Sequence, residues 1–131
     1  MKSSTWNDIG LLILRLGIGG FILTTHGWGK LVGFNELAAR FPDPIGLGPT
    51  ASLALAVFAE ALCGLLLVLG LGTRFAAVPL LVTMLVAAFV VHAGDPWAKK
   101  ELALLYAIPF LTLIFTGGGR FALERVIRVK G

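Results

Sequence analysis

Four long apolar segments run through the chain and leave few folds open to it. They lie at about Ile9 to Leu31, Thr50 to Gly72, Thr73 to Ala93 and Glu101 to Gly117. A hydrocarbon core about 30 Å thick takes around 20 helical residues to cross. Strands of a membrane β-barrel would alternate apolar and polar residues instead, and these segments do not. The sequence therefore predicts an all-α membrane protein: a four-transmembrane-helix bundle in one domain, residues 1–131.

The balance of residue types agrees with a membrane protein and argues against a soluble one. Hydrophobic residues fill 57% of the 131 positions and charged residues only 14%, against about 25% charged in soluble domains. The net charge of +4 does not indicate nucleic-acid binding, because the lysines and arginines lie mainly at segment ends, where they suit lipid headgroups. We expect the first segment to be retained, since Arg15 interrupts it and no small-residue cleavage site follows.

The stretches outside the spans carry further signals. After the first span, Phe34, Leu37 and Phe41 predict either a short amphipathic helix at the membrane interface or a plain surface loop. Residues 70–74 alone separate the second and third spans, which predicts a tight antiparallel hairpin. The basic tail, residues 118–131, mixes apolar and basic residues and is expected either to lie on anionic lipid or to be a frayed helix end.

The distribution of basic residues predicts how the chain is oriented. An even number of spans puts both termini on one side of the membrane. The basic residues expected on that side are Lys2, Arg74, Arg120, Arg125, Arg128 and Lys130, and those expected on the other side are Lys30, Arg40, Lys99 and Lys100. Because cytoplasmic segments carry the excess of basic residues, both termini are expected in the cytoplasm.

Five ionisable residues within or at the ends of the spans are the candidate site residues. They are Arg15, His26, Glu60, His92 and Glu101. A charge near the bilayer centre costs about 3 kcal/mol, so such residues usually face the bundle interior and have partners. Helical geometry puts Arg15 and His26 on one face of the first span and Glu60 in a stripe of small residues on the second. Both faces are expected to point at neighbouring helices.

With cytoplasmic termini, all of these residues except Arg15 fall in the outer half of the bundle and predict a polar pocket open toward the outer face. Glu60 lies deepest, about 15 Å below the outer surface. It is expected either to form a structural ion pair with Arg15 or to act as a ligand or proton carrier. Histidine and glutamate at helix ends often only face water, which stays the alternative for His26, His92 and Glu101. No ligand pair lies one turn apart on a helix, so no metal site is expected.

The chain resembles the DoxX family of small bacterial four-helix membrane proteins. The matching runs are LLILRLGIGGFILTTHGWGKL in the first span, AEALCGLLLVLGLGTRFAA in the second, MLVAAFVVH in the third and GGGRFALE near the end. Their order and spacing together carry the resemblance, which covers nearly the whole chain. It implies a multi-pass protein of the bacterial inner membrane. Some members resemble membrane subunits of thiosulfate:quinone oxidoreductases, and others accompany quinone-detoxifying or thiol-stress proteins.

The resemblance thus implies a quinone-interacting or redox-associated membrane subunit. A quinone is the expected cofactor, and Cys63 is the only cysteine. The sequence has no flavin motif and no haem pair, so electrons are expected from a soluble or membrane redox partner, and no catalytic residue is assigned. Two alternatives stay open: a non-catalytic scaffold or assembly factor that recruits a partner through its basic tail, and a small-molecule or proton-coupled transporter, which would have to be a homo-oligomer.

Overall fold

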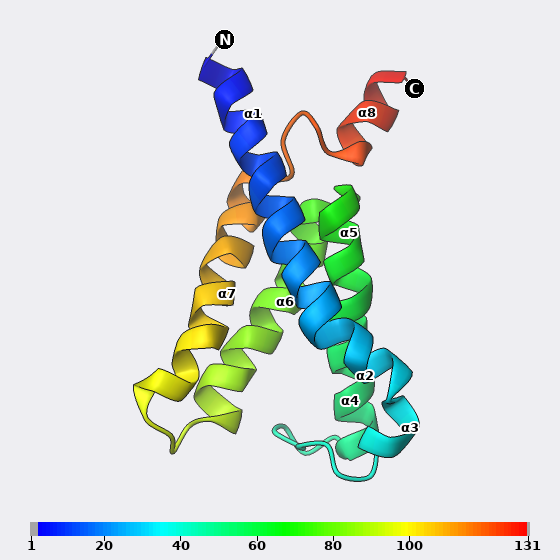
Figure 1. Cartoon of the computed structure of the whole chain (residues 1–131), viewed down its shortest axis with the longest axis vertical. Helices are drawn as coiled ribbons and strands as arrows, with labels where there is room; N and C mark the ends of the chain where they lie inside the picture. The colour runs from blue at the N-terminus through cyan, green and yellow to red at the C-terminus, as the bar shows by residue number, and fades with distance from the viewer. Residues whose placement is uncertain (1–2, 131) are drawn as a thin grey trace.

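The structure is a computed structural model that describes residues 3–130, with the side chains of 5–127. Of the residues used to predict the orientation, Lys2 lies outside the described residues, as does Gly131 at the end of the tail, and the side chains of Arg128 and Lys130 are not described. Every regular element in the described part is a helix. Four long helical rods form the molecule, and both termini lie at one end of it (Figure 1). This is the terminal end, and the opposite one is the distal end.

Each rod alternates between α-helical and wider π-helical turns, except the last. The first rod consists of α1 (Ser3–Leu14), η1 (Arg15–Gly19), η2 (Ile22–Gly27) and α2 (Trp28–Val32). The second consists of α4 (Pro49–Val57), η3 (Phe58–Cys63) and α5 (Gly64–Leu69), the third of α6 (Thr73–Val86) and η4 (Ala87–Val91), and the fourth of α7 (Trp97–Thr116). Two short helices complete the chain, α3 (Phe34–Leu37) and α8 (Leu123–Lys130).

Three of the rods are long and apolar enough to cross a membrane: Thr5–Val32, Pro49–Leu69 and Thr73–Val91. The fourth, α7, has 20 residues, but it starts with a charged group, Lys99, Lys100 and Glu101, which shortens its apolar part. The all-helical prediction is therefore confirmed, and three of the four predicted spans have the required length and composition.

The connections between the rods can be compared with those that the sequence predicts. Gly70 and Gly72 adopt positive φ angles of 77° and 55°, and the backbone N–H of Leu71 donates to Leu66 O at 2.9 Å, so the second rod ends in a glycine-capped turn. This turn forms the predicted tight hairpin. After the first rod, the stretch for which the sequence left a short helix or a loop open contains the single helical turn α3, followed by irregular chain up to Pro49.

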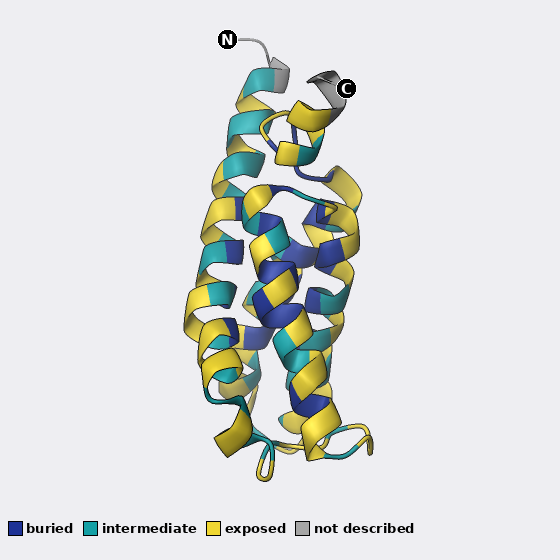
Figure 2. Ribbon diagram, turned by 90° about the vertical axis from the view of Figure 1, so that its right-hand side faces the viewer, coloured by how far each residue is buried: buried dark blue, intermediate teal, exposed yellow. Residues whose placement is uncertain are grey.

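Small residues let the first and second rods approach closely, as the sequence predicts. A Cβ added at Gly19 would lie 3.1 Å from Gly64 O, and one added at Gly27 would lie 2.6 Å from the backbone carbon and oxygen of Glu60. Ile22 packs beside them and is fully buried. Large apolar side chains also cover the outside of the bundle, where Phe75 is 84% exposed and Phe115 is 75% exposed. Exposed positions, in yellow, recur along the rods in Figure 2. An apolar exterior of this extent is what lipid contact requires.

Candidate functional site

A cavity of about 400 Å³ opens in the distal half of the bundle. Side chains from all four rods and from the loop 41–45 line it. Asp43 fixes that loop by accepting hydrogen bonds from Gly48 N at 3.0 Å and Ser52 Oγ at 3.2 Å. Most lining residues are apolar, and the polar ones with ionisable groups are His26, Lys30, Glu60, His92, Lys99 and Tyr106. The cavity therefore combines apolar walls with a few converging polar groups, as small-molecule sites do.

The deepest charges in the cavity form an ion pair. Lys30 on α2 donates from Nζ to Glu60 Oε1 at 2.7 Å. The Glu60 side chain is only 4% exposed and that of Lys30 is 23% exposed. Glu60 Oε2 accepts no hydrogen bond from the part of the chain that the structure describes. A buried carboxylate thus has one oxygen neutralised by a cation and one oxygen available.

The pair depends on the crossing of the first two rods. Gly27 lies against the backbone of Glu60, and Lys30 follows Gly27 by three residues, about one helical turn. Any side chain at position 27 would push the two rods apart. The glycine therefore sets the separation at which lysine and glutamate meet.

Arg15 lies elsewhere, near the terminal end. Its Nε donates to Gly118 O at 3.0 Å, and its Nη1 donates to Leu67 O at 3.1 Å and Val68 O at 2.9 Å. The ion pair between Arg15 and Glu60, one of the two interpretations of the sequence, is wrong. The two rods run antiparallel, so Arg15 faces residues seven and eight positions beyond Glu60, about 11 Å along the helix.

His26 contacts Tyr106 in the lining of the cavity. Their ring centroids lie 5.6 Å apart with an interplanar angle of 89°, an edge-to-face arrangement. Tyr106 in turn stacks on Phe110, with centroids 6.1 Å apart. One wall of the cavity is therefore aromatic and offers an imidazole and a phenol hydroxyl.

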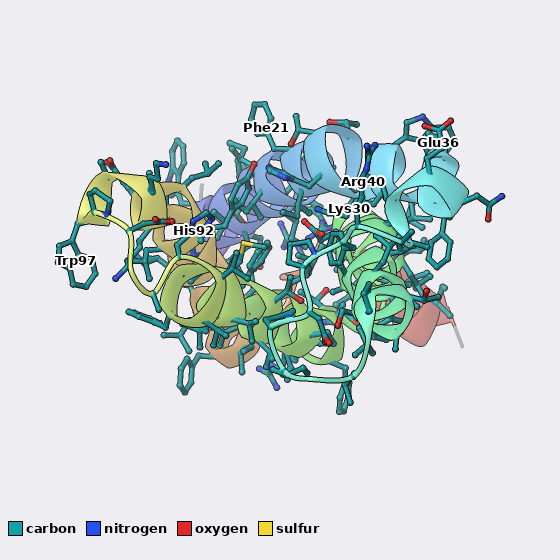
Figure 3. All side chains as sticks on the ribbon, turned by 90° about the horizontal axis from the view of Figure 1, so that it is seen from below. Phe21, Lys30, Glu36, Arg40, His92 and Trp97 are labelled. Carbon is teal, nitrogen blue, oxygen red and sulfur yellow. The ribbon has the colours of Figure 1, made fainter. Side chains whose placement is uncertain are left out.

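His92 marks the distal rim. Its Nδ1 lies 2.8 Å from Asp95 Oδ2 in the turn that follows η4, and this hydrogen bond, assisted by the positive charge of Lys99, lowers the pKa of the exposed Asp95 carboxyl. With Nδ1 held in this way, Nε2 is the ring nitrogen left to serve the cavity. Figure 3 looks into the molecule from the distal end, with Lys30 on the first rod and His92 on the third.

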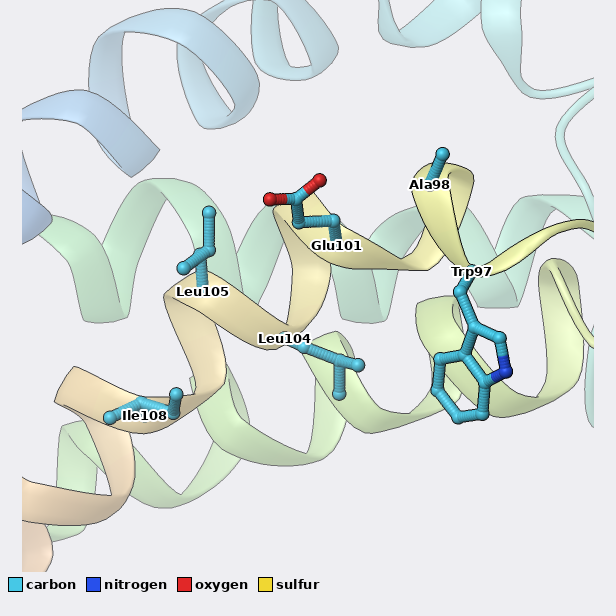
Figure 4. Close-up of a pocket in the computed structure, with 6 residues that line it drawn as sticks. All are labelled: Trp97, Ala98, Glu101, Leu104, Leu105 and Ile108. Carbon is cyan, nitrogen blue, oxygen red and sulfur yellow. The ribbon is translucent and has the colours of Figure 1, made fainter.

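Glu101 does not line this cavity. It is exposed and borders a shallower groove of about 300 Å³ on the outside of α7, together with Trp97, Leu104 and Ile108 (Figure 4). Of the five candidate residues, the structure brings His26, Glu60 and His92 to one cavity and places Arg15 and Glu101 outside it. Among the described residues, no three histidine, cysteine or carboxylate side chains gather to form a metal site.

Comparison with known proteins identifies the family. The DoxX family matches residues 10–93, most of the chain and the three rods that lie there. The chain belongs to the DoxX family.

Similar proteins agree with this assignment. An uncharacterized protein of Haemophilus influenzae is 31% identical over 129 residues, which cover 93% of this chain and 85% of that protein. The inner membrane protein YqjF of Escherichia coli is 27% identical over 127 residues, 94% of this chain and 95% of YqjF. A second uncharacterized protein of Haemophilus influenzae is 35% identical over 121 residues, 87% of each chain. No solved structure gives a significant match. The chain is thus a DoxX-family integral membrane protein.

Three ionisable residues of this DoxX protein's cavity were missed from the sequence, namely Lys30, Lys99 and Tyr106. Lys30 and Lys99 were used only to predict the orientation, although Lys30 follows His26 by four residues and therefore shares its helix face. Tyr106 was overlooked, although it is the only tyrosine of the chain and lies in the fourth apolar segment. A phenol hydroxyl at that position needs a polar partner, and this was the available signal.

The three predicted residues Arg15, His26 and Glu60 of this DoxX protein all lie in π-helical turns, namely η1, η2 and η3. Such turns are rare, and they are frequent at functional sites. Each one takes more residues per turn than an α-helix, so the face that follows it is offset from the face that a 3.6-residue period predicts. The 3.6-residue period used to align faces in the sequence accordingly holds only within each turn segment.

Proposed function

We propose that this DoxX protein crosses the bacterial inner membrane four times with cytoplasmic termini. We further propose that it binds a quinone head group in the distal cavity as the membrane subunit of a redox partner. The length of α7, 20 residues packed along α6, supports the fourth crossing. The excess of basic residues at the terminal end supports the orientation. The distal cavity then lies in the outer half of the bilayer.

The observation that carries this function is the buried Lys30–Glu60 pair beside His26 and Tyr106, in a cavity with mostly apolar walls. A quinone head group is an apolar ring with two carbonyl acceptors. Lys30 Nζ, the Tyr106 hydroxyl and a ring N–H of His26 are suitable donors to such oxygens. The volume of about 400 Å³ lies within the usual range of small-molecule sites, about 300–1,000 Å³.

A bound quinone would supply two-electron chemistry that also consumes two protons. The chain's own contribution is to hold the ring and to keep protons available near it. Glu60 is a suitable proton carrier because one of its oxygens is not engaged by Lys30. His92, at the rim, connects the cavity with the water outside.

Extraction of quinone from purified protein tests this function. Wild-type protein in native-lipid nanodiscs, loaded with ubiquinone or menaquinone, is expected to retain it, and Glu60→Gln and Lys30→Met are expected to lose it. Glu101→Gln is the matched control, since Glu101 is a carboxylate of the same end that lies outside the cavity. Wild-type protein that binds neither quinone, or Glu60→Gln protein that binds as wild type, would refute the proposal.

Labelling of single cysteines tests the topology separately. Cys63 is buried, so Cys63→Ala provides the background. Cysteines placed at Arg74 and at Asp95 are expected to react with a membrane-impermeant maleimide from opposite sides of inner-membrane vesicles. A cysteine at Arg120 should react from the same side as one at Arg74, and reaction from the opposite side would remove the fourth crossing.

A further inference from the structure

The C-terminal helix α8 is fixed to the bundle at its start. The backbone N–H of Glu124 donates to Gly70 O at 3.0 Å, and Glu124 Oε2 accepts from Gly72 N at 2.9 Å. Both contacts are made to the turn between α5 and α6. A carboxylate beside the first residues of α6 is also favoured by that helix's dipole. The first turn of α8 is therefore a positioned element and not a frayed helix end.

The segment before α8 is packed just as firmly. Ala122 is fully buried, and a Cβ at Gly70 would lie 2.6 Å from it. Arg15 holds Gly118 O from inside the bundle. These contacts fix the place where α8 leaves the bundle.

One face of α8 is apolar and has no cover. Leu123 is 38% exposed, Val126 is 39% exposed and Ile127 is 56% exposed. At 100° per residue these three side chains fall on one side of the helix, and Glu124 and Arg125 fall on the other. Figure 1 shows α8 at the terminal end, beyond the turn that holds it.

The charges around this face indicate what covers it. Arg74, Arg120 and Arg125 are exposed at the same end. The acidic groups there already have partners, because Glu124 accepts from Gly72 N, and Asp8 accepts from Arg120 N at 3.0 Å and lies 3.7 Å from Arg120 Nε. The end is thus basic, next to an apolar face, in an integral membrane protein.

We propose that α8 is a lipid-binding helix whose Leu123, Val126 and Ile127 insert among anionic phospholipids while Arg74 and Arg125 contact their phosphates. Amphipathic helices with basic polar faces bind such surfaces in this way. The proposal does not depend on a quinone or on the distal cavity.

Spin labels on α8 test this proposal. In the full-length Cys63→Ala protein, a label replaces Ile127 on the apolar face of α8 or the exposed Arg120 that precedes α8, which is the control because the proposal gives it no phosphate contact. Each protein is placed in nanodiscs of pure phosphatidylcholine or of phosphatidylcholine with 30% phosphatidylglycerol. The label at Ile127 is expected to become accessible to oxygen and shielded from a water-soluble nickel chelate when phosphatidylglycerol is present. The label at Arg120 is expected to stay accessible to the chelate in both lipid mixtures.

A second variant tests whether the arginines are needed for binding to anionic lipid. Arg74→Gln combined with Arg125→Gln, labelled at Ile127, is expected to lose the dependence on phosphatidylglycerol, while the fold, measured by its melting temperature, is kept. Chelate access at Ile127 in both lipid mixtures would overturn the proposal. So would an immobilised label with dipolar coupling to a second label, which would show that another copy of the chain covers the face.

Discussion

The two ends of the molecule each bury charge, and they do it differently. At the terminal end, Arg15 is 1% exposed and its Nε and Nη1 donate to three backbone carbonyls. At the distal end, Glu60 is 3% exposed, pairs with Lys30 and borders a cavity. The arginine at the terminal end is held by three backbone carbonyls. The glutamate at the distal end has one oxygen that Lys30 does not engage, and it borders a cavity. The comparison teaches that burial of charge alone does not identify a ligand site.

The surroundings of Arg15 at the terminal end are closely packed. Within the described residues, Arg15 Nη2 and Thr73 Oγ1 are buried without a hydrogen-bond partner. A Cβ at Gly118 would already lie 2.7 Å from Thr73 Oγ1 and 3.3 Å from Arg15 Cδ. The two atoms are therefore enclosed by protein, and we assign Arg15 a structural role in holding the C-terminal segment.

Replacement of Arg15 should give the largest effect. Arg15→Met leaves three carbonyls without their donor and is expected to lower the free energy of unfolding by about 3 kcal/mol. Arg15→Lys should recover only part of this, because an ammonium cannot reach three carbonyls in the fork geometry of guanidinium. Unfolding by SDS in mixed micelles measures both variants. An unchanged midpoint for Arg15→Met would contradict the structural role.

The crossing at Gly27 should rank second. Gly27→Ala forces a methyl group to within 2.6 Å of the Glu60 backbone and is expected to destabilise by about 1–3 kcal/mol. Gly20→Ala is the matched control, because a Cβ there meets nothing within 4 Å and alanine is the better helix former by about 1 kcal/mol. Thermal unfolding with both variants in one detergent separates them. Equal melting temperatures of Gly27→Ala and Gly20→Ala would contradict the role of Gly27 in setting the distance between the first two rods.

The Lys30–Glu60 pair should have a smaller effect on stability than on binding. Lys30 is 23% exposed, so we expect Lys30→Met to cost about 1–2 kcal/mol and the double variant with Glu60→Gln to recover about 1 kcal/mol of the summed loss. A double-mutant cycle on unfolding measures the coupling. Lys100→Met is the control, a lysine of the same end without an ion pair in the described chain. Zero coupling would mean that the pair contributes nothing to the fold.

The smallest effect is expected at the rim of the cavity, where the turn that contains Asp95 should change only at low pH. The hydrogen bond from His92 and the charge of Lys99 lower the pKa of Asp95. A lowered carboxyl pKa stabilises the turn at neutral pH, and this contribution is lost only as the pH falls below about 4. Trp97 fluorescence, recorded with Trp6 and Trp28 replaced by phenylalanine, should change as the pH falls below about 4. Asp95→Asn should abolish this change, and the same change in Asp95→Asn protein would contradict the assignment.

How much of the site the sequence revealed differs between the two ends. The faces of Arg15 and Glu60 were predicted correctly because a buried charge in an apolar segment must point at other helices. Their partners were not predicted. Which residues pair depends on the depth of each side chain along two antiparallel rods, and this depth is known only once the crossing of the rods is known. His26 and His92 were predicted at the distal end, and both line the cavity there. Glu101, near the start of α7, was predicted beside them but borders the groove on the outside of that helix.

The sequence by itself determined the helical, membrane-embedded architecture, because runs of apolar residues of bilayer length can satisfy their backbone hydrogen bonds only within helices. It also determined that the small-residue faces of the first two spans point at neighbouring helices. Tertiary structure alone decided that Lys30 meets Glu60, that Tyr106 faces His26 and that Arg15 holds the C-terminal segment. The physical reason is that an ion pair depends on distances of a few ångströms between rods, and these are set by where glycines let backbones touch and where π-helical turns rotate the faces.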